Sequence, residues 1–435
     1  MFKRMLVLFL FAFAALMVSM RGIETAARRT PPPVFNFPSA RDNPPAGWTG
    51  PVFQLSQDYP TTAPPPETLP WKAFDFKTQP MQYVNALLAY GLEGNTEVDF
   101  QVQNNAVRKW YHAPWMHTGR EFIHGMTHER ASRPKELAPT QTTLFQNWAV
   151  GFYNASGGYA LGKVWANPNA PDPALARFPD GTVAFKLLFT QASVAEVPYL
   201  KNDYEWLADI NQVSKTGKQP ETMRLLQIDV AVRDTRAAGT TGWVFGTFIY
   251  DGDRPGTTPF DRLVPIGLMW GNDPSKVISG GTLTQTFINP DQHIPQHLGY
   301  KGRLNGPVDN KVSSCLSCHS TAAISLNPPR PTISGIPPAN PTNAQLRSYF
   351  RNIKAGTPFT PGYTSLDYSL QLQVGIANWV SSGAVPPPVG PPGAPGIAPA
   401  HSPISRKAMN IIKPMERDGT PEPAPVSPVK RGRRH

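Results

Sequence analysis

The clearest chemistry in the chain lies in one short motif of two cysteines and a histidine, Cys315-Leu316-Ser317-Cys318-His319. Cys315 and Cys318 are the only two cysteines among 435 residues. On a helical turn, thiols at this spacing reach the two vinyl groups of a porphyrin and form thioethers, and the histidine that follows presents its imidazole to the iron from the same side. The motif therefore predicts one covalently attached haem, with His319 as the proximal ligand of the iron.

Three other roles for a Cys-x-x-Cys pair compete with haem attachment. A thioredoxin-like redox pair would lie in a βαβ unit, and the sequence around Cys315 has no such pattern. A structural disulfide would not require His319, and a zinc site would require two further ligands. Haem attachment is therefore the favoured interpretation.

At this motif, residues 301–383 resemble a monohaem cytochrome c domain. The resemblance implies a small helical fold, covalent haem at Cys315 and Cys318, and axial ligation by His319. It covers about a fifth of the chain and does not extend upstream. The chain also departs from the family, because the segment Gly299–Pro307 stands where such a domain has a helix.

The motif leaves the sixth coordination position of the iron unassigned. Small cytochromes c usually supply a methionine some tens of residues after the motif, but none occurs here between His319 and Met409. Met409 and Met415 lie in a proline-rich tail, where a fixed ligand is not expected. The position is thus predicted to be filled from upstream or left open, and we expect the upstream region to pack with residues 301–383 as one unit.

Histidines upstream of the motif are candidates for this position. The stretch Trp110–Glu129 holds His112, His117, His124 and His128, four of the nine histidines. His124 and His128 are four residues apart, which would place both imidazoles on one face of a helix, at a spacing suited to a metal. Three interpretations compete: a buried polar and aromatic cluster, which is favoured, a distal haem pocket, and an independent metal site.

A second histidine pair, His293 and His297, lies about twenty residues before the motif. Pro290 and Pro295 favour a loop, which could fold back over the haem and present either imidazole as a distal ligand. Met269, in a predicted strand, is a further candidate.

Strand patterns dominate residues 71–300, the region that must position these groups. The strongest patterns are Val183–Thr190, Leu226–Arg233, Gly242–Tyr250 and Leu263–Trp270. In the second of them, apolar residues alternate with more polar ones, which predicts one buried face and one wet face. Short strands separated by turn sequences favour an antiparallel sandwich or barrel.

Helical patterns are fewer and lie mostly after the motif. One helix is predicted over Pro80–Gly91, ahead of the strands. Gln345–Ile353 and Leu366–Gly383 also have helical spacing, with Asp367 and Gln371 on the solvent side of the latter. The predicted fold class is α+β: a β-rich N-terminal region followed by a small helical cytochrome c-like domain, with disordered proline-rich ends.

The two ends of the chain differ in composition from its middle. Residues 1–27 have the layout of a secretory signal, with the apolar run Met5–Val18 after two positive charges. This layout predicts a periplasmic or otherwise exported protein, with an uncleaved membrane anchor as the alternative. The predicted order is a signal peptide at 1–27, a proline-rich linker at 28–70, a β-rich domain at 71–300, the haem domain at 301–383, and a disordered basic tail at 384–435.

The distribution of charge argues against a nucleic-acid partner. Of the net charge of +11, residues 1–29 contribute +4 and residues 401–435 contribute +5, so the middle of the chain is nearly neutral. Basic residues at the tip of the tail could make weak contact with a membrane surface that carries anionic lipid, namely Lys430, Arg431, Arg433 and Arg434.

Two functions remain, and whether the protein is an enzyme stays open. The favoured one is an electron carrier with six-coordinate iron that meets a redox partner protein. The alternative is a haem enzyme or small-ligand binder, of the peroxidase or nitric-oxide type, with an open iron site. Sequence patterns for nucleotide binding and serine hydrolysis are absent.

Overall fold

The computed structural model describes residues 44–116, 120–211, 218–291, 297–327 and 330–381. All of them belong to one compact unit, Phe37–His435. The predicted signal peptide and tail lie outside the described residues, as do the first part of the linker, His117, His293, Met409 and Met415. No helix in the described part of the chain is both long enough and apolar enough to cross a membrane.

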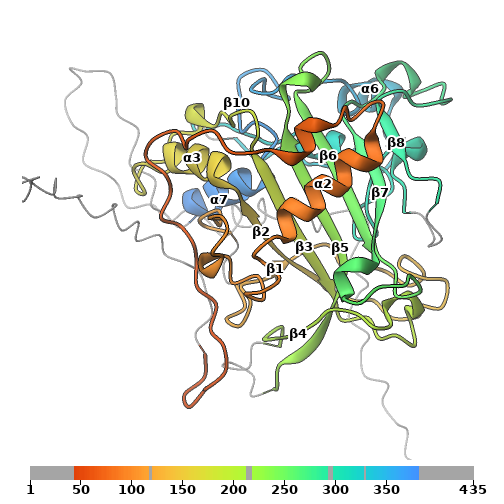
Figure 1. Ribbon diagram of the computed structural model, residues 1–435. Helices are drawn as coiled ribbons and strands as arrows, with labels where there is room; N and C mark the ends of the chain where they lie inside the picture. The colour runs from red at the N-terminus through yellow and green to blue at the C-terminus, as the bar shows by residue number, and fades with distance from the viewer. Residues whose placement is uncertain (1–43, 117–119, 212–217, 292–296, 328–329, 382–435) are drawn as a thin grey trace, which may run out of the picture. The chain divides into compact units, whose positions relative to one another are not determined.

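One antiparallel sheet of eight strands forms the centre of the fold (Figure 1), in the order β1-β2-β3-β5-β6-β7-β8, with β4 pairing with the start of β5. The strands are β1 (Thr127–His128), β2 (Asn147–Tyr153), β3 (Val183–Thr190), β4 (Glu205–Ala208), β5 (Glu221–Arg233), β6 (Trp243–Tyr250), β7 (Leu263–Met269) and β8 (Thr286–Ile288). All four predicted strands are confirmed. The predicted sandwich or barrel is not found among the described strands. The edge strands β1 and β8 do not pair with each other, and the second described sheet has only two strands, β9 and β10.

The two faces of the sheet differ in what covers them. On one face of β5, the apolar residues Leu226, Ile228, Val230 and Val232 are buried as predicted. The other face is not wet, since Gln227 is fully buried and residues after position 300 cover it. The sequence pattern distinguishes a polar face from an apolar one, but a polar face can line a cavity as well as meet solvent.

Helix α2 (Pro80–Leu92) covers the apolar face and confirms the predicted helix. In Figure 1 it crosses the strands of the sheet on the near side. Gly246 of β6 lets it approach, because a Cβ at this glycine would lie 3.1 Å from the side chain of Val84. The next residue of β6, Thr247, points to the opposite face of the sheet.

Five short elements follow position 300: α5 (Cys315–His319), β9 (Ala323–Ile324), α6 (Asn343–Tyr349), β10 (Thr364–Ser365) and α7 (Leu370–Ser381). Two of the predicted helices are confirmed, although α7 begins four residues later than predicted. Asp367 therefore lies in the loop before α7 and is buried, not on the solvent side of a helix. The antiparallel pair β9–β10 occurs where the sequence predicted only helices.

The other helices described are α3 (Ala155–Val164) and short 3-10 turns, η1 (Pro70–Ala73), η2 (Val102–Asn104), η3 (Pro173–Leu175), η4 (Pro198–Leu200), η5 (Thr235–Ala237), η6 (Pro259–Arg262), η7 (Pro274–Lys276) and η8 (Tyr300–Gly302).

Hydrogen bonds join the segment after position 300 to the sheet. The Arg303 guanidinium is buried and donates to the carbonyl oxygens of Asn272 at 2.8 Å and Asp273 at 3.1 Å. The Tyr153 and Ser369 hydroxyls lie 2.8 Å apart. The upstream region and residues 301–381 thus pack together, as predicted.

Candidate functional site

A cavity of about 180 Å³ lies between the polar face of the sheet and the segment after position 300. Cys315, Cys318 and His319 line it from one side, and strands β1, β2, β3, β5 and β6 line it from the other. The register of the sheet sets the second wall. Directly paired residues form a row across four strands, Gly151 with Lys186, Lys186 with Asp229, and Asp229 with Thr247.

Helix α5 presents the two thiols to this cavity. Ser314 caps the helix, since its Oγ accepts from the amide of Ser317 at 3.1 Å while Ser317 Oγ accepts from the amide of Ser314 at 2.8 Å. Leu316 is buried and fixes the opposite side of the helix. Cys315 and Cys318, one turn apart, both face the cavity and are free thiols.

Close packing holds the Cys318 thiol in place. A Cβ built on Gly335 would lie 2.5 Å from Cys318 Sγ, so only glycine fits beside this sulfur. Burial raises the pKa of Cys318 to about 12 and raises the pKa of Cys315 well above its ordinary value. Both thiols are therefore protonated at neutral pH, which is unlike the thiolates of redox-active Cys-x-x-Cys pairs.

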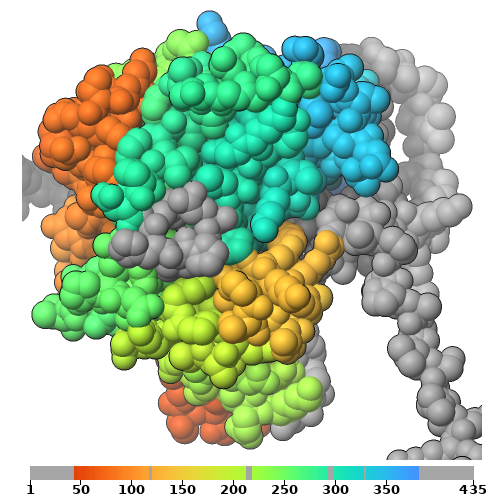
Figure 2. All heavy atoms as spheres, turned by 90° about the vertical axis from the view of Figure 1, so that its right-hand side faces the viewer, coloured from red at the N-terminus to blue at the C-terminus, as the bar shows by residue number. Residues whose placement is uncertain are grey.

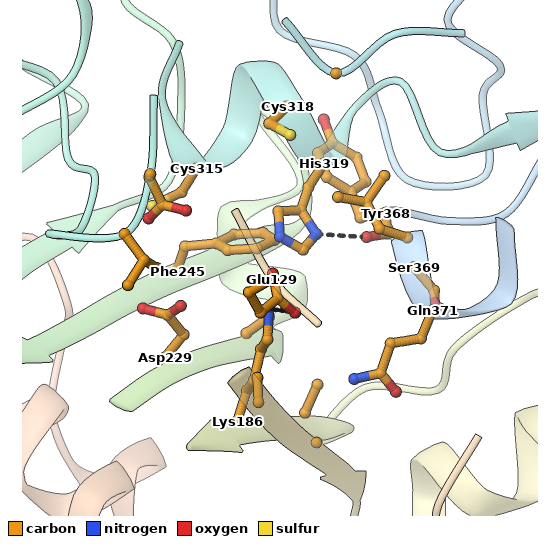
Figure 3. Close-up of a pocket in the computed structure, with 18 of the residues that line it drawn as sticks. Glu129, Lys186, Asp229, Phe245, Cys315, Cys318, His319, Tyr368, Ser369 and Gln371 are labelled. Atoms are coloured by element: carbon orange, nitrogen blue, oxygen red, sulfur yellow. Dashed lines mark hydrogen bonds and ion pairs between the residues drawn. The ribbon is translucent and has the colours of Figure 1, made fainter. Parts of the chain in front are cut away.

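His319 is oriented by a backbone carbonyl. Its Nδ1 donates to the carbonyl oxygen of Tyr368 at 2.9 Å, which leaves Nε2 as the nitrogen available to a metal. Figure 3 shows the imidazole directed into the cavity, with Phe245 beside it at a ring separation of 4.7 Å. Burial lowers the pKa of His319 to about 4, so the imidazole is neutral at physiological pH, as a ligand must be.

The loop that carries Tyr368 is strained and firmly held. Asp367 and Tyr368 have φ values of 49° and 69°, a left-handed conformation that such residues rarely adopt. The Asp367 carboxylate accepts from Trp243 Nε1 at 3.1 Å and from the amides of Gly356 at 3.0 Å and Phe178 at 2.9 Å. These three bonds keep the Tyr368 carbonyl directed at His319.

A charged network lies across the cavity from His319 (Figure 3). Lys186 pairs with Glu129 at 2.7 Å. Asp229 accepts from Gln227 Nε2 at 2.8 Å and from Thr247 Oγ1 at 2.9 Å. Burial, and then the charge of Asp309, raise the pKa of Asp229 to about 7. The wall therefore combines an ammonium donor with carboxyl groups that can exchange a proton near neutral pH.

The histidines proposed as distal ligands do not line this cavity. His124 stacks on Trp206 with ring centroids 4.1 Å apart, and His128 lies edge-on to Trp148 at 4.0 Å. The expected helix is not formed either, since His124 lies before β1 and His128 within it. Among the described residues, no group of three or more His, Cys, Asp or Glu side chains is arranged to hold a metal ion. The described residues therefore supply no ligand set for a zinc ion or for an independent metal site.

The other candidates are also away from the cavity. His112 is buried, and its Nδ1 accepts from the amide of Ser56 at 3.0 Å. His297 is buried and forms a hydrogen bond with the backbone of Leu137. Figure 2 shows segments near residue 130 (orange) next to segments near residue 300 (teal) on the face in view. Met269 is buried but is not part of the cavity wall.

The stretch Trp110–Glu129 reaches the cavity through residues other than its histidines. Met116, Arg120, Thr127 and Glu129 all line it. Of the histidines described in this stretch, His112 and His124 are buried among aromatic side chains, as in the interpretation that the sequence favoured, whereas His128 is exposed.

Sequence reasoning missed three residues of the candidate site: Lys186, Asp229 and Tyr368. Lys186 and Asp229 are polar positions in predicted strands, which ordinarily indicate a wet face. The one available signal was a pair of charges, Lys186 and Asp229, each placed within a strongly apolar strand.

Comparison of the chain with protein-family models, with curated proteins and with solved structures finds no match.

Proposed function

We propose that this chain is a c-type cytochrome that holds one covalent haem in the cavity beside α5. A single arrangement carries the proposal: two thiols and an imidazole line one cavity, and the Nδ1 of His319 is already occupied by Tyr368. Thioether bonds at Cys315 and Cys318 would hold the porphyrin, and Nε2 of His319 would ligate the iron.

The residues of the cavity fit such a group. The cavity wall formed by the sheet includes small residues, which leave room for a flat group: Ala149, Gly151, Ala184 and Ala231. Arg120 is buried in the wall, and it forms no ion pair among the described residues. Its guanidinium would suit a carboxylate at the edge of a porphyrin.

Export supports covalent attachment, because haem c is attached after a protein leaves the cytoplasm. We place the protein in the periplasm or another exported location, on the signal-like layout of residues 1–27. We propose that its partner is a redox protein and not a nucleic acid. We also propose weak contact between the basic tail and anionic lipid.

Electron transfer is the first proposed role, and Met116 bears on it. When bound, the haem supplies one-electron redox chemistry and a Lewis-acidic iron. Met116 lines the cavity, and its thioether is a candidate for the second axial position. Six-coordinate iron with a methionine ligand is typical of electron carriers.

Small-ligand binding is the second candidate, because of the charged wall. Lys186, Glu129 and Asp229 line the cavity. A protein that only transfers electrons requires no buried carboxyl group or ammonium beside its haem. A bound small molecule, in contrast, would form hydrogen bonds with both groups and exchange a proton with the carboxyl group.

Staining for covalent haem tests the proposal. Full-length protein produced with the haem-attachment machinery should keep haem-dependent peroxidase staining on a denaturing gel. Replacing both Cys315 and Cys318 by alanine should abolish it, whereas Ser320→Ala, at the end of the same helix, should keep it. Covalent haem retained in the double variant would contradict the assignment.

Optical spectra then separate the two roles. For an electron carrier ligated by Met116, the wild type should be low-spin in both oxidation states, and Met116→Leu should become high-spin with a lower potential. For a small-ligand binder, the wild type should be high-spin and Met116→Leu should leave the spectrum unchanged.

A further inference from the structure

The row of paired residues across the sheet places groups of different chemistry side by side on the cavity wall. Gly151, Lys186, Asp229 and Thr247 face each other on β2, β3, β5 and β6, and adjacent strands are about 4.8 Å apart. At one end of the row, Gly151 leaves room for the side chain of Gln371, because a Cβ on this glycine would lie 2.3 Å from Gln371 Nε2. The row thus offers a cation, a carboxyl group and a hydroxyl to one small volume.

The hydrogen-bond donors of this wall are well defined. Burial lowers the pKa of Lys186, but Glu129 and then Asp229 raise it by more, so the side chain is an ammonium. The ammonium has three N–H bonds, and its ion pair at 2.7 Å is with a single oxygen of Glu129. The ammonium therefore has a donor left for a ligand in the cavity.

Carboxyl groups near the Lys186 ammonium supply the acceptors of this wall. Gln227 Nε2 bonds to both oxygens of Asp229, at 2.8 and 2.9 Å, and approaches Asp309 at 3.5 Å. Two buried carboxyl groups this close do not both ionise readily. The other charged groups that line the cavity are Glu129, Arg120 and Arg130, and Arg130 pairs with Glu136 at 2.5 Å.

A buried amide points independently to a ligand. Gln373 lines the cavity and is 1% exposed, and its Oε1 has no hydrogen-bond partner among the described residues. A buried polar atom left without a partner is destabilising, so native proteins rarely keep one. A protic group in the cavity would satisfy it.

We infer that this wall binds a small weak acid, such as hydrogen peroxide, hydrogen cyanide or hydrazoic acid, on the side of the cavity opposite His319. The acid gives its proton to the Asp229 carboxylate, and the resulting anion accepts a hydrogen bond from the Lys186 ammonium. The acid loses one proton and the carboxylate gains it, and no electron moves. The inference rests on the proposed haem, whose iron would supply the Lewis acid for the anion.

Azide titration of the oxidised holoprotein tests the inference, with the Soret band as the readout. Lys186→Met should raise the azide dissociation constant about tenfold or more, because it removes the cation that pairs with the bound anion. In the wild type this constant should rise as the pH rises above about 7, where Asp229 must take up a proton on binding, and in Asp229→Asn that rise should disappear because an amide takes up no proton. Thr247→Val, which removes one bond to Asp229 without changing charge, should raise the azide dissociation constant about threefold.

Matched controls come from an exposed pair with the same separation. Lys109 and Asp58 lie 2.7 Å apart at the surface, and Lys109→Met and Asp58→Asn should leave azide binding unchanged. Carbon monoxide carries no proton and no charge, so its affinity for the reduced protein should change less than about threefold in Asp229→Asn and Lys186→Met.

The outcomes separate this inference from the proposed function. Equal azide affinity and equal pH dependence in the wild type and all three wall variants, or a wild-type haem that binds no azide, would overturn the inference and leave the haem assignment intact. Equal losses of azide and carbon monoxide binding would also overturn it, by indicating a general disruption. A wild type without covalent haem would overturn the proposed function itself.

Discussion

His319 and Tyr368 are 49 residues apart in sequence, yet Nδ1 of His319 donates a hydrogen bond to the carbonyl oxygen of Tyr368 at 2.9 Å. This bond selects the tautomer that leaves Nε2 free and fixes the plane of the ring. It exists because Asp367 and Tyr368 hold a left-handed backbone conformation. The orientation of the proposed iron ligand therefore depends on a loop outside the motif.

The first prediction concerns Asp367, which holds that loop. Asp367→Ala should lower the free energy of unfolding by about 3 kcal/mol or more, because it leaves buried donors of Trp243, Gly356 and Phe178 without an acceptor. The Soret band of the holoprotein should also shift, since His319 loses its fixed orientation. Chemical denaturation and an optical spectrum measure the two effects. Asp58→Ala, at an exposed carboxylate, is the control and should change neither.

The second prediction concerns the cap of helix α5. Ser314→Ala should lower the free energy of unfolding by about 1 kcal/mol through loss of the cap. It should also lower the fraction of chains that carry covalent haem, because the two cysteines depend on this helical turn. Thr342→Ala removes the equivalent cap of α6 and should cause a similar loss of stability with full haem content. Equal haem content in the two variants would contradict the positioning role of Ser314.

The third prediction concerns the space beside Cys318. Gly335→Ala should reduce haem attachment, because the added Cβ would lie 2.5 Å from Cys318 Sγ and displace it. Gly239→Ala is the matched control, since a Cβ there meets nothing within 4 Å. Haem per chain, measured as the pyridine complex, should fall only in the first variant. Normal haem content in Gly335→Ala would show that the thiol can move without loss of attachment.

The fourth prediction concerns stability at acid pH. Burial lowers the pKa of His297 from its ordinary value of 6.5 to about 4. The unfolded chain therefore binds more protons below pH 6.5, so the contribution is complete above that pH and is lost as the pH falls toward 4. The free energy of unfolding should fall by up to about 3 kcal/mol from this residue alone.

Denaturant titrations at several pH values measure this effect. His297→Gln should flatten the decline in unfolding free energy between pH 6.5 and pH 4. His128→Gln, at an exposed position on β1, should keep the slope of the wild type. The same slope in both variants would mean that His297 is not the group responsible.

Local patterns were sufficient for most individual elements. The strand pattern Val183–Thr190 gives β3 with the same bounds, because a short apolar run that follows the turn sequence Pro179-Asp180-Gly181 is typical of a buried strand. Pro80 at the first helical position marks the start of α2. The boundary of α7 was missed because Asp367 and Tyr368 continue the helical spacing in sequence but adopt a left-handed backbone.

The sequence by itself determined the candidate cofactor chemistry, since Cys315, Cys318 and His319 lie within one helical turn and their mutual geometry is local. Only the tertiary structure decided what surrounds them. The register of β3, β5 and β6 brings Lys186, Asp229 and Thr247 into one row, and the segment after position 300 turns that polar face into a cavity wall. Periodicity specifies which side chains share a face, but what covers the face depends on contacts between residues far apart in the chain, for which a single sequence carries no local signal.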